Sequence, residues 1–249
     1  MATPDTIPRA VTPQVDTAPA GWVWHSLAAL TVVLFGVTLY LIFMEAPVEE
    51  QMGIVQKIFY FHVPSAYCMY VGYTAAAVGG LLYLWKRSPR WDAISLAGAE
   101  IGVLFTAIVL VTGPLWGRKA WGVYWVWDPR LTSTLLTGMI YASFLALRGF
   151  GSTGEAEKRF AAALAIVGFP LLFLIKYSVK RWSGQHPVVI SGGGGGIAEG
   201  MVPALIASFL AFTALVAWML LARYRVERQR QELWSLELEA ARRGLGGEA

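Results

Sequence analysis

The chain alternates long apolar runs with short polar segments. Six runs reach or approach the roughly 20 residues that a helix needs to cross a hydrocarbon core of about 30 Å. They cover approximately 24–44, 63–85, 94–114, 131–147, 160–177 and 201–222. The pattern predicts an all-α integral membrane protein whose domain, 22–222, contains about six transmembrane helices.

The two ends of the chain are polar. Residues 1–21 are rich in proline and threonine, cannot bury enough apolar surface to fold alone, and are expected to be a disordered cytoplasmic tail. Residues 223–249 place leucines among mixed charges, which predicts a cytoplasmic amphipathic helical tail continuing from the last span. A solvated or membrane-surface helix explains this tail without a dedicated partner site.

Lysine and arginine are unevenly distributed across the predicted spans. With the N-terminus inside, 13 of the 20 basic residues lie on that side and 7 on the other. Because cytoplasmic loops carry the excess of basic residues, both termini are expected in the cytoplasm. The net charge of +4 is therefore a signal of topology, and nothing in the sequence resembles a nucleic-acid site.

Composition agrees with a membrane protein, since 56% of the residues are hydrophobic and 14% charged, against roughly 45–50% and 25% in soluble domains. The single cysteine, Cys68, lies in an apolar run and is expected to be a small buried hydrophobe. Without a second thiol, the chain can form no internal disulfide and cannot attach a c-type haem through two thioethers.

The most unusual segment is GPLWGRKAWGVYWVWDPRLTS, residues 113–133, on the expected outer side. An anchoring belt at the membrane interface is one interpretation of its aromatic residues. However, the loop contains more aromatic rings than the lipid headgroups around it are expected to cover. The rings are those of Trp116, Trp121, Tyr124, Trp125 and Trp127.

These rings could instead form a ligand platform. A helix would place Trp121, Tyr124, Trp125 and Asp128 on one face, and an extended segment would do so for Trp121, Trp125 and Trp127. Either surface would suit a flat, partly charged ligand such as haem. Basic groups that could pair with haem propionates flank the rings: Arg118, Lys119 and Arg130.

Asp128 also has a structural explanation. In WDPRLTS it directly precedes a proline, the pattern of an N-cap residue followed by proline at the first helical position. We expect its main role to be capping of the fourth span, which still allows it to shape the platform.

Two of the three histidines lie on the expected outer side. His62 is in YFHVPSAY and His186 in SGQHPVVI, and a nearby proline restrains the backbone after each. Paired imidazoles on one side of a membrane could be axial ligands of one haem iron, although single loop histidines often have no such role. Zinc is disfavoured because no third ligand is placed nearby. His25, at the cytoplasmic start of the first span, needs no function.

Two further features receive no role. Glu100 lies about two turns from the cytoplasmic end of the third span, where either partial exposure or pairing with an arginine would explain it. The glycine run SGGGGGIAEG, in the outer loop at about 179–200, lacks the ending of a phosphate-binding loop and is expected to be a flexible linker.

The segment WGVYWVWDPRLTS resembles the WWD signature of the haem-handling proteins of cytochrome c maturation, written WGxxWxWDxRLT. The matching positions are Trp121, Gly122, Trp125, Trp127, Asp128, Arg130, Leu131 and Thr132. About six spans with one such loop, at about 115–130, are similar to the CcmC family within this group. The resemblance extends over most of 22–222. The sequence departs from the pattern at Tyr124, where tryptophan is frequent, and in the polyglycine after His186.

The resemblance implies a function. His62 and His186 would be the axial ligands of a non-covalently bound haem b at the outer face of the bacterial inner membrane. The haem would be presented to the chaperone CcmE, with CcmD and the ABC transporter subunits CcmA and CcmB in the same complex and lipid around the spans. No Walker motif or conventional catalytic site is present in the sequence. A b-type cytochrome that carries electrons and a haem permease are the alternatives.

The charge asymmetry makes a topological prediction. Reporter fusions or cysteine labelling should place Lys86, Arg148 and the C-terminus in the cytoplasm, and Trp121 and His186 outside. Labelling of position 186 from the cytoplasmic side alone would overturn this interpretation, because the expected site requires a common outer face.

Overall fold

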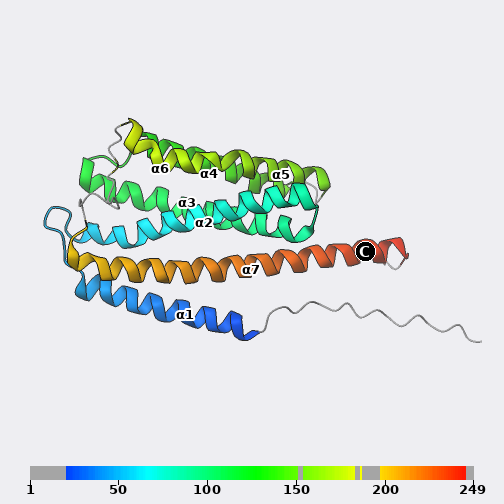
Figure 1. The fold of residues 1–249 in the computed structure, drawn as a ribbon, viewed down its shortest axis with the longest axis horizontal. Helices are drawn as coiled ribbons and strands as arrows, with labels where there is room; N and C mark the ends of the chain where they lie inside the picture. Colours follow the sequence, from blue (N-terminus) through cyan, green and yellow to red (C-terminus); the bar gives the residue numbers. More distant parts are fainter. Residues whose placement is uncertain (1–20, 151–153, 183–185, 187–196, 245–249) are drawn as a thin grey trace, which may run out of the picture.

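A computed structural model describes residues 21–150, 154–182, 186 and 197–244. The predicted disordered tail and most of the polyglycine loop lie outside these residues. The described chain is all-α, as predicted (Figure 1). Its helices are α1 (Gly21–Tyr40), η1 (Leu41–Glu45), η2 (Ile54–Ile58), α2 (Phe59–Lys86), α3 (Pro89–Trp121), α4 (Pro129–Phe150), α5 (Glu155–Gly168), α6 (Pro170–Trp182), η3 (Glu199–Met201) and α7 (Val202–Arg242).

Within the described part of the chain, six helical segments are long and apolar enough to cross a membrane, which confirms the predicted number. Helices α5 and α6 together make one of them, with a break at Phe169. The break falls there because Pro170 has no N–H to continue the helical hydrogen bonds. Helix α7 continues through the last span as far as Arg242.

One predicted boundary is wrong. The third span was expected to end at Pro114, but α3 continues to Trp121 with Pro114 inside it. A proline inside a helix removes one hydrogen bond and can bend the helix without ending it. The loop between α3 and α4 therefore comprises only 122–128, and the first two tryptophans of the expected loop lie on the helix.

Helices α2 and α3 form the closest pair in the bundle. A Cβ atom added at Gly72 would lie 2.5 Å from the backbone nitrogen of Gly102, and one at Gly98 would lie 2.5 Å from that of Ala76. Gly98 and Gly102 have the GxxxG spacing that lets membrane helices approach backbone to backbone. This contact fixes how residues of α3 stand opposite those of α2.

The remaining helices flank this pair (Figure 1). Helix α7 lies between the pair and α1, while α4, α5 and α6 lie on the opposite side. At the centre, the rings of Tyr73 and Tyr141 stack with centroids 3.8 Å apart. The Tyr141 hydroxyl donates to the carbonyl of Ala165 at 2.8 Å, so this core links α2, α4 and α5. Cys68 is fully buried, as expected.

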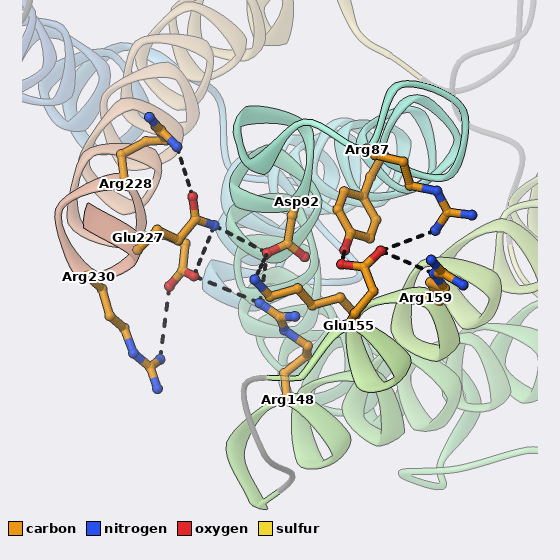
Figure 2. Close-up of polar contacts among 11 residues, drawn as sticks. Arg87, Asp92, Arg148, Glu155, Arg159, Glu227, Arg228 and Arg230 are labelled. Atoms are coloured by element: carbon orange, nitrogen blue, oxygen red, sulfur yellow. Dashed lines mark hydrogen bonds and ion pairs between the residues drawn. The ribbon is translucent and has the colours of Figure 1, made fainter. Parts of the chain in front are cut away.

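Ion pairs join the helices at one end of the bundle (Figure 2). Arg148 at the end of α4 contacts Asp92 of α3 at 3.0 Å and Glu227 of α7 at 3.8 Å, and all three side chains are at least nine-tenths buried. Lys158 of α5 approaches Asp92 at 3.9 Å. The described start of α1 and the end of α7 lie at this same end, opposite the aromatic loop (Figure 1).

Glu100 is paired, which was one of its two expected explanations. Both of its carboxylate oxygens accept hydrogen bonds from Arg223 of α7, at 2.5 and 2.6 Å. A bidentate pair of this kind gives geometric specificity as well as energy. It ties α3 to α7 within the bundle and explains the charged residue without a functional role.

The buried ion pairs predict a stability difference. Arg148→Ala should leave Glu227 without its closest buried cation, and lower the free energy of unfolding by about 3 kcal/mol. This value is at the lower end of the range for a broken buried ion pair, because Lys158 still approaches Asp92. Thermal unfolding of the purified protein in detergent would measure it.

The matched control is Arg87→Ala. Arg87 pairs with Glu155 at 3.3 Å, and both side chains are about half exposed, so its removal should cost less than about 1 kcal/mol. Equal losses in the two variants would contradict the importance of burial at Arg148.

Candidate ligand-binding site

A cavity of about 450 Å³ lies at the end of the bundle opposite the ion pairs. Its walls come from the start of α2, the end of α3, the start of α4, the end of α6 and Phe209 of α7, with Trp125 and His186 from outside the helices, and they are mainly apolar and aromatic. Apolar pockets with a few convergent polar groups are the usual form of a ligand site. Six of the expected site residues line it: His62, His186, Trp116, Trp121, Trp125 and Arg130.

The rings of the two histidines lie close together. Their ring centroids are 6.4 Å apart and their planes are inclined by 31°. With metal–imidazole bonds of about 2 Å and each ring centre about 1 Å behind its bonded nitrogen, one metal ion between two imidazoles places the centroids about 6 Å apart. The observed spacing therefore suits two axial ligands of one metal ion.

Helix α3 holds the ring of His62, which lies in the first turns of α2. The Nδ1 atom of His62 is 2.8 Å from the hydroxyl oxygen of Thr112. This hydroxyl donates to the carbonyl of Ile108 at 2.7 Å. Beside it, a Cβ added at Gly113 would come within 3.2 Å of His62 Cε1, so the glycine leaves room for the ring.

The start of α4 holds His186 by its backbone and by its ring. The backbone N–H of His186 donates to Asp128 Oδ2 at 3.3 Å. Arg130 Nη1 lies 3.0 Å from His186 Nδ1. The same guanidinium donates to the carbonyls of Ile175 and Lys176, at 3.2 and 3.4 Å, and so joins α4 to α6.

Asp128 caps α4, as the sequence predicted. Its Oδ1 atom accepts the backbone N–H of Leu131 at 2.8 Å, and Pro129 is the first helical residue. Asp128 does not line the cavity. Because its other carboxylate oxygen accepts the His186 backbone N–H, it acts on the site by positioning this histidine.

The aromatic residues do not form one flat platform, which corrects the expectation. Helix α3 ends at Trp121, Gly122 takes a left-handed conformation with φ 78°, and 125–128 is neither helix nor strand. The described rings form two edge-to-face pairs, Trp116 with Trp121 at 5.9 Å and Trp125 with Trp127 at 5.5 Å. Trp116, Trp121 and Trp125 consequently line the cavity as separate walls.

Two of the expected aromatic residues do not line the cavity. Tyr124 and Trp127 are 57% and 76% exposed and are absent from its lining. Trp125 lines it, and its indole Nε1 is buried with no hydrogen-bond partner among the described residues. A buried donor without a partner is costly, so this atom indicates a place where a ligand could accept a hydrogen bond.

The basic residues also divide into two groups. Arg118 hydrogen-bonds the carbonyl of Gly122 and lies 5.6 Å from the ring centre of Tyr124. Arg118 and Lys119 are exposed and do not line the cavity, whereas Arg130 and Lys176 do. Sequence reasoning missed Lys176 and Thr112, because only the contacts between helices bring them to the site.

The described residues contain no group of three His, Cys, Asp or Glu side chains that could hold a metal ion. The arrangement is therefore that of a multi-pass membrane protein with an apolar cavity, paired imidazoles and tryptophan walls at one end of its bundle. The family profile described as Heme exporter protein C, CcmC, matches residues 7–239. The chain belongs to this family.

Three relatives have similar sequences. The Heme exporter protein C of Bradyrhizobium diazoefficiens is 36% identical over 87% of this chain and 83% of its own length. The Heme exporter protein C of Escherichia coli K12 is 36% identical over 67% of this chain and 68% of its own length. A putative cytochrome c biosynthesis ccmC-like mitochondrial protein of Marchantia polymorpha is 36% identical over 73% of this chain and 76% of its own length.

The close contact at Gly117 predicts how the tryptophan wall can be disturbed. A Cβ at Gly117 would lie 2.8 Å from Cε3 of the Trp121 ring, so Gly117→Ala should displace the ring at a cost of about 1–3 kcal/mol. Gly36→Ala is the control, because nothing lies within 4 Å of a Cβ there. If haem binds in the cavity, Gly117→Ala alone should retain less of it through purification, as measured by absorbance. Equal retention in both variants would contradict a role for the Trp121 wall.

Proposed function

We propose that this protein handles haem for cytochrome c maturation, holding haem b without a covalent bond at the outer face of the bacterial inner membrane. The observation that supports this most directly is the pair of imidazoles 6.4 Å apart in an apolar cavity. Membership of the Heme exporter protein C family supports haem as the ligand. His62 and His186 would be its axial ligands.

Several features of the cavity fit haem. Its volume of about 450 Å³ lies in the range of sites for small molecules and cofactors. Its two imidazoles are the axial ligands that many haem proteins use. The Trp125 N–H, which has no partner among the described residues, and the cations Arg130 and Lys176 offer a donor and two positive charges for the propionates.

Each residue has a distinct task in this proposal. Bound haem iron supplies two axial positions that neutral imidazoles can fill. Thr112 orients His62, and Asp128 and Arg130 position His186. The tryptophan walls bury apolar surface of the ligand and exclude water. With one cysteine the chain cannot attach haem through two thioethers, so transfer to another protein would require that these contacts be given up.

The partners follow from the same proposal. We propose that haem is presented to the chaperone CcmE, and that CcmD and the transporter subunits CcmA and CcmB belong to the complex. Trp127 and Tyr124 are exposed beside the cavity, where a partner protein could contact them. An electron-carrying b-type cytochrome is less well supported, because the histidine pair lies at the end of the bundle beside this exposed loop.

Axial ligation makes a spectroscopic prediction. Haem with two histidine ligands should be low spin, and His62→Ala or His186→Ala should open a coordination position, weaken retention and shift the absorption spectrum. Added imidazole should partly restore both properties, because it can fill the vacated position.

The control is His25→Ala, since His25 lies near the start of α1, at the other end of the bundle. Its spectrum should match that of the unaltered protein. An unchanged haem spectrum after both His62→Ala and His186→Ala in one chain would show that other residues bind the iron.

A further inference from the structure

The hydrogen bonds of the two site histidines place their ring protons on different nitrogens. We assign these tautomers from the hydrogen-bond network. A threonine hydroxyl has one hydrogen, and that of Thr112 is donated to Ile108. With that hydrogen on the carbonyl, we assign the Thr112 oxygen as the acceptor from His62, which places the proton of the His62 ring on Nδ1. In neutral His62, Nε2 carries no proton.

At His186 the assignment is reversed. An arginine guanidinium can only donate hydrogen bonds, so His186 Nδ1 accepts from Arg130 Nη1 at 3.0 Å. The proton of the neutral His186 ring is consequently on Nε2. Its unprotonated nitrogen is the one that Arg130 occupies.

This difference bears on iron binding, because a metal requires an unprotonated imidazole nitrogen. His62 offers such a nitrogen while keeping its bond to Thr112, which is the usual arrangement of a metal-binding histidine with a fixed second nitrogen. His186 offers none until the bond to Arg130 breaks. The bond to Arg130 must break in either case. If Nδ1 binds the iron, its lone pair must be free of Arg130; if Nε2 binds the iron, its proton must first move to Nδ1.

Arg130 can give up this bond without losing its place. Its Nε and Nη2 atoms donate to the carbonyls of Ile175 and Lys176, which hold the guanidinium at the cavity wall. A carboxylate arriving with the ligand would be a stronger acceptor for Nη1 than a neutral imidazole, because charge-assisted hydrogen bonds are the stronger ones.

We infer that Arg130 is a latch that holds His186 off the metal in the empty site and exchanges this histidine for a ligand carboxylate when haem binds. The inference rests on the proposed haem function. It makes ligation ordered, with His62 binding the iron first and His186 second. It also makes His186 the ligand that can be released when haem leaves, since Arg130 is ready to bind it again.

Rapid mixing of ferric haem with the haem-free protein, followed by absorption, tests the order. The unaltered protein should show a fast phase with one histidine bound and then a slower phase that gives the low-spin spectrum. Arg130→Met should speed the second phase by roughly tenfold or more, the size expected for loss of one charge-assisted hydrogen bond, and should also retain haem less tightly. A second phase that is unchanged or slower would overturn the latch.

Two variants separate the latch from simpler effects. Lys176→Met removes the other cation from the cavity wall but leaves the His186 bond, so it should weaken retention without speeding the second phase. Thr112→Val should slow the first phase, and Thr112→Ser should restore it, because serine keeps the hydroxyl that accepts from His62. An acceleration in Lys176→Met equal to that in Arg130→Met would assign the effect to charge alone and overturn the latch.

A measurement without haem covers the case in which Arg130→Met fails to fold. The chain has three histidines, so ¹⁵N spectra of the haem-free protein, assigned with His25→Ala, report each ring. We expect a protonated Nδ1 in His62 and a protonated Nε2 in His186, and the same tautomer in both rings would overturn the latch. If the unaltered protein binds no haem, this result would instead contradict the proposed function itself.

Discussion

The turn that begins α4 supports the whole candidate site. Asp128 caps the helix with one carboxylate oxygen and accepts the His186 backbone N–H with the other. One helical turn is thus joined to a segment 58 residues away in the sequence. Arg130 extends the same connection to the carbonyls at the end of α6. Without this capped turn, neither His186 nor the guanidinium would have a fixed position relative to His62.

The other half of the site depends on how closely α2 and α3 approach. Gly72 and Gly102 leave no space for side chains between the helices, so their backbones set the register of one helix against the other. That register brings Thr112 beside His62 at the end of the pair. The histidine is therefore oriented by packing that begins ten residues away along α3.

The sequence predicted the spans well because apolar length alone determines whether a helix can cross a membrane. It also identified His62, His186 and three of the tryptophans that line the cavity, since these are unusual residues in an unusual pattern. It could not predict Thr112 or Lys176, whose importance exists only through contacts between helices. Periodicity also misjudged the rings, because the loop between Trp121 and Pro129 is neither helix nor strand. The GxxxG spacing of Gly98 and Gly102 was visible and would have indicated the close helix pair.

The two ends of the bundle hold their charged groups in different ways. At one end, Arg148 contacts both Asp92 and Glu227, all three side chains are buried, and removal of the arginine would leave the two carboxylates without it. At the other end, Trp125 keeps a buried N–H without a partner among the described residues, and Arg130 is bonded to a neutral imidazole. A ligand with carboxylates and an iron atom could improve both of these contacts. The bundle is thus fixed by buried ion pairs at one end and remains open to a better set of contacts where the site lies, which is the distribution that a protein needs if it must bind a cofactor and later release it.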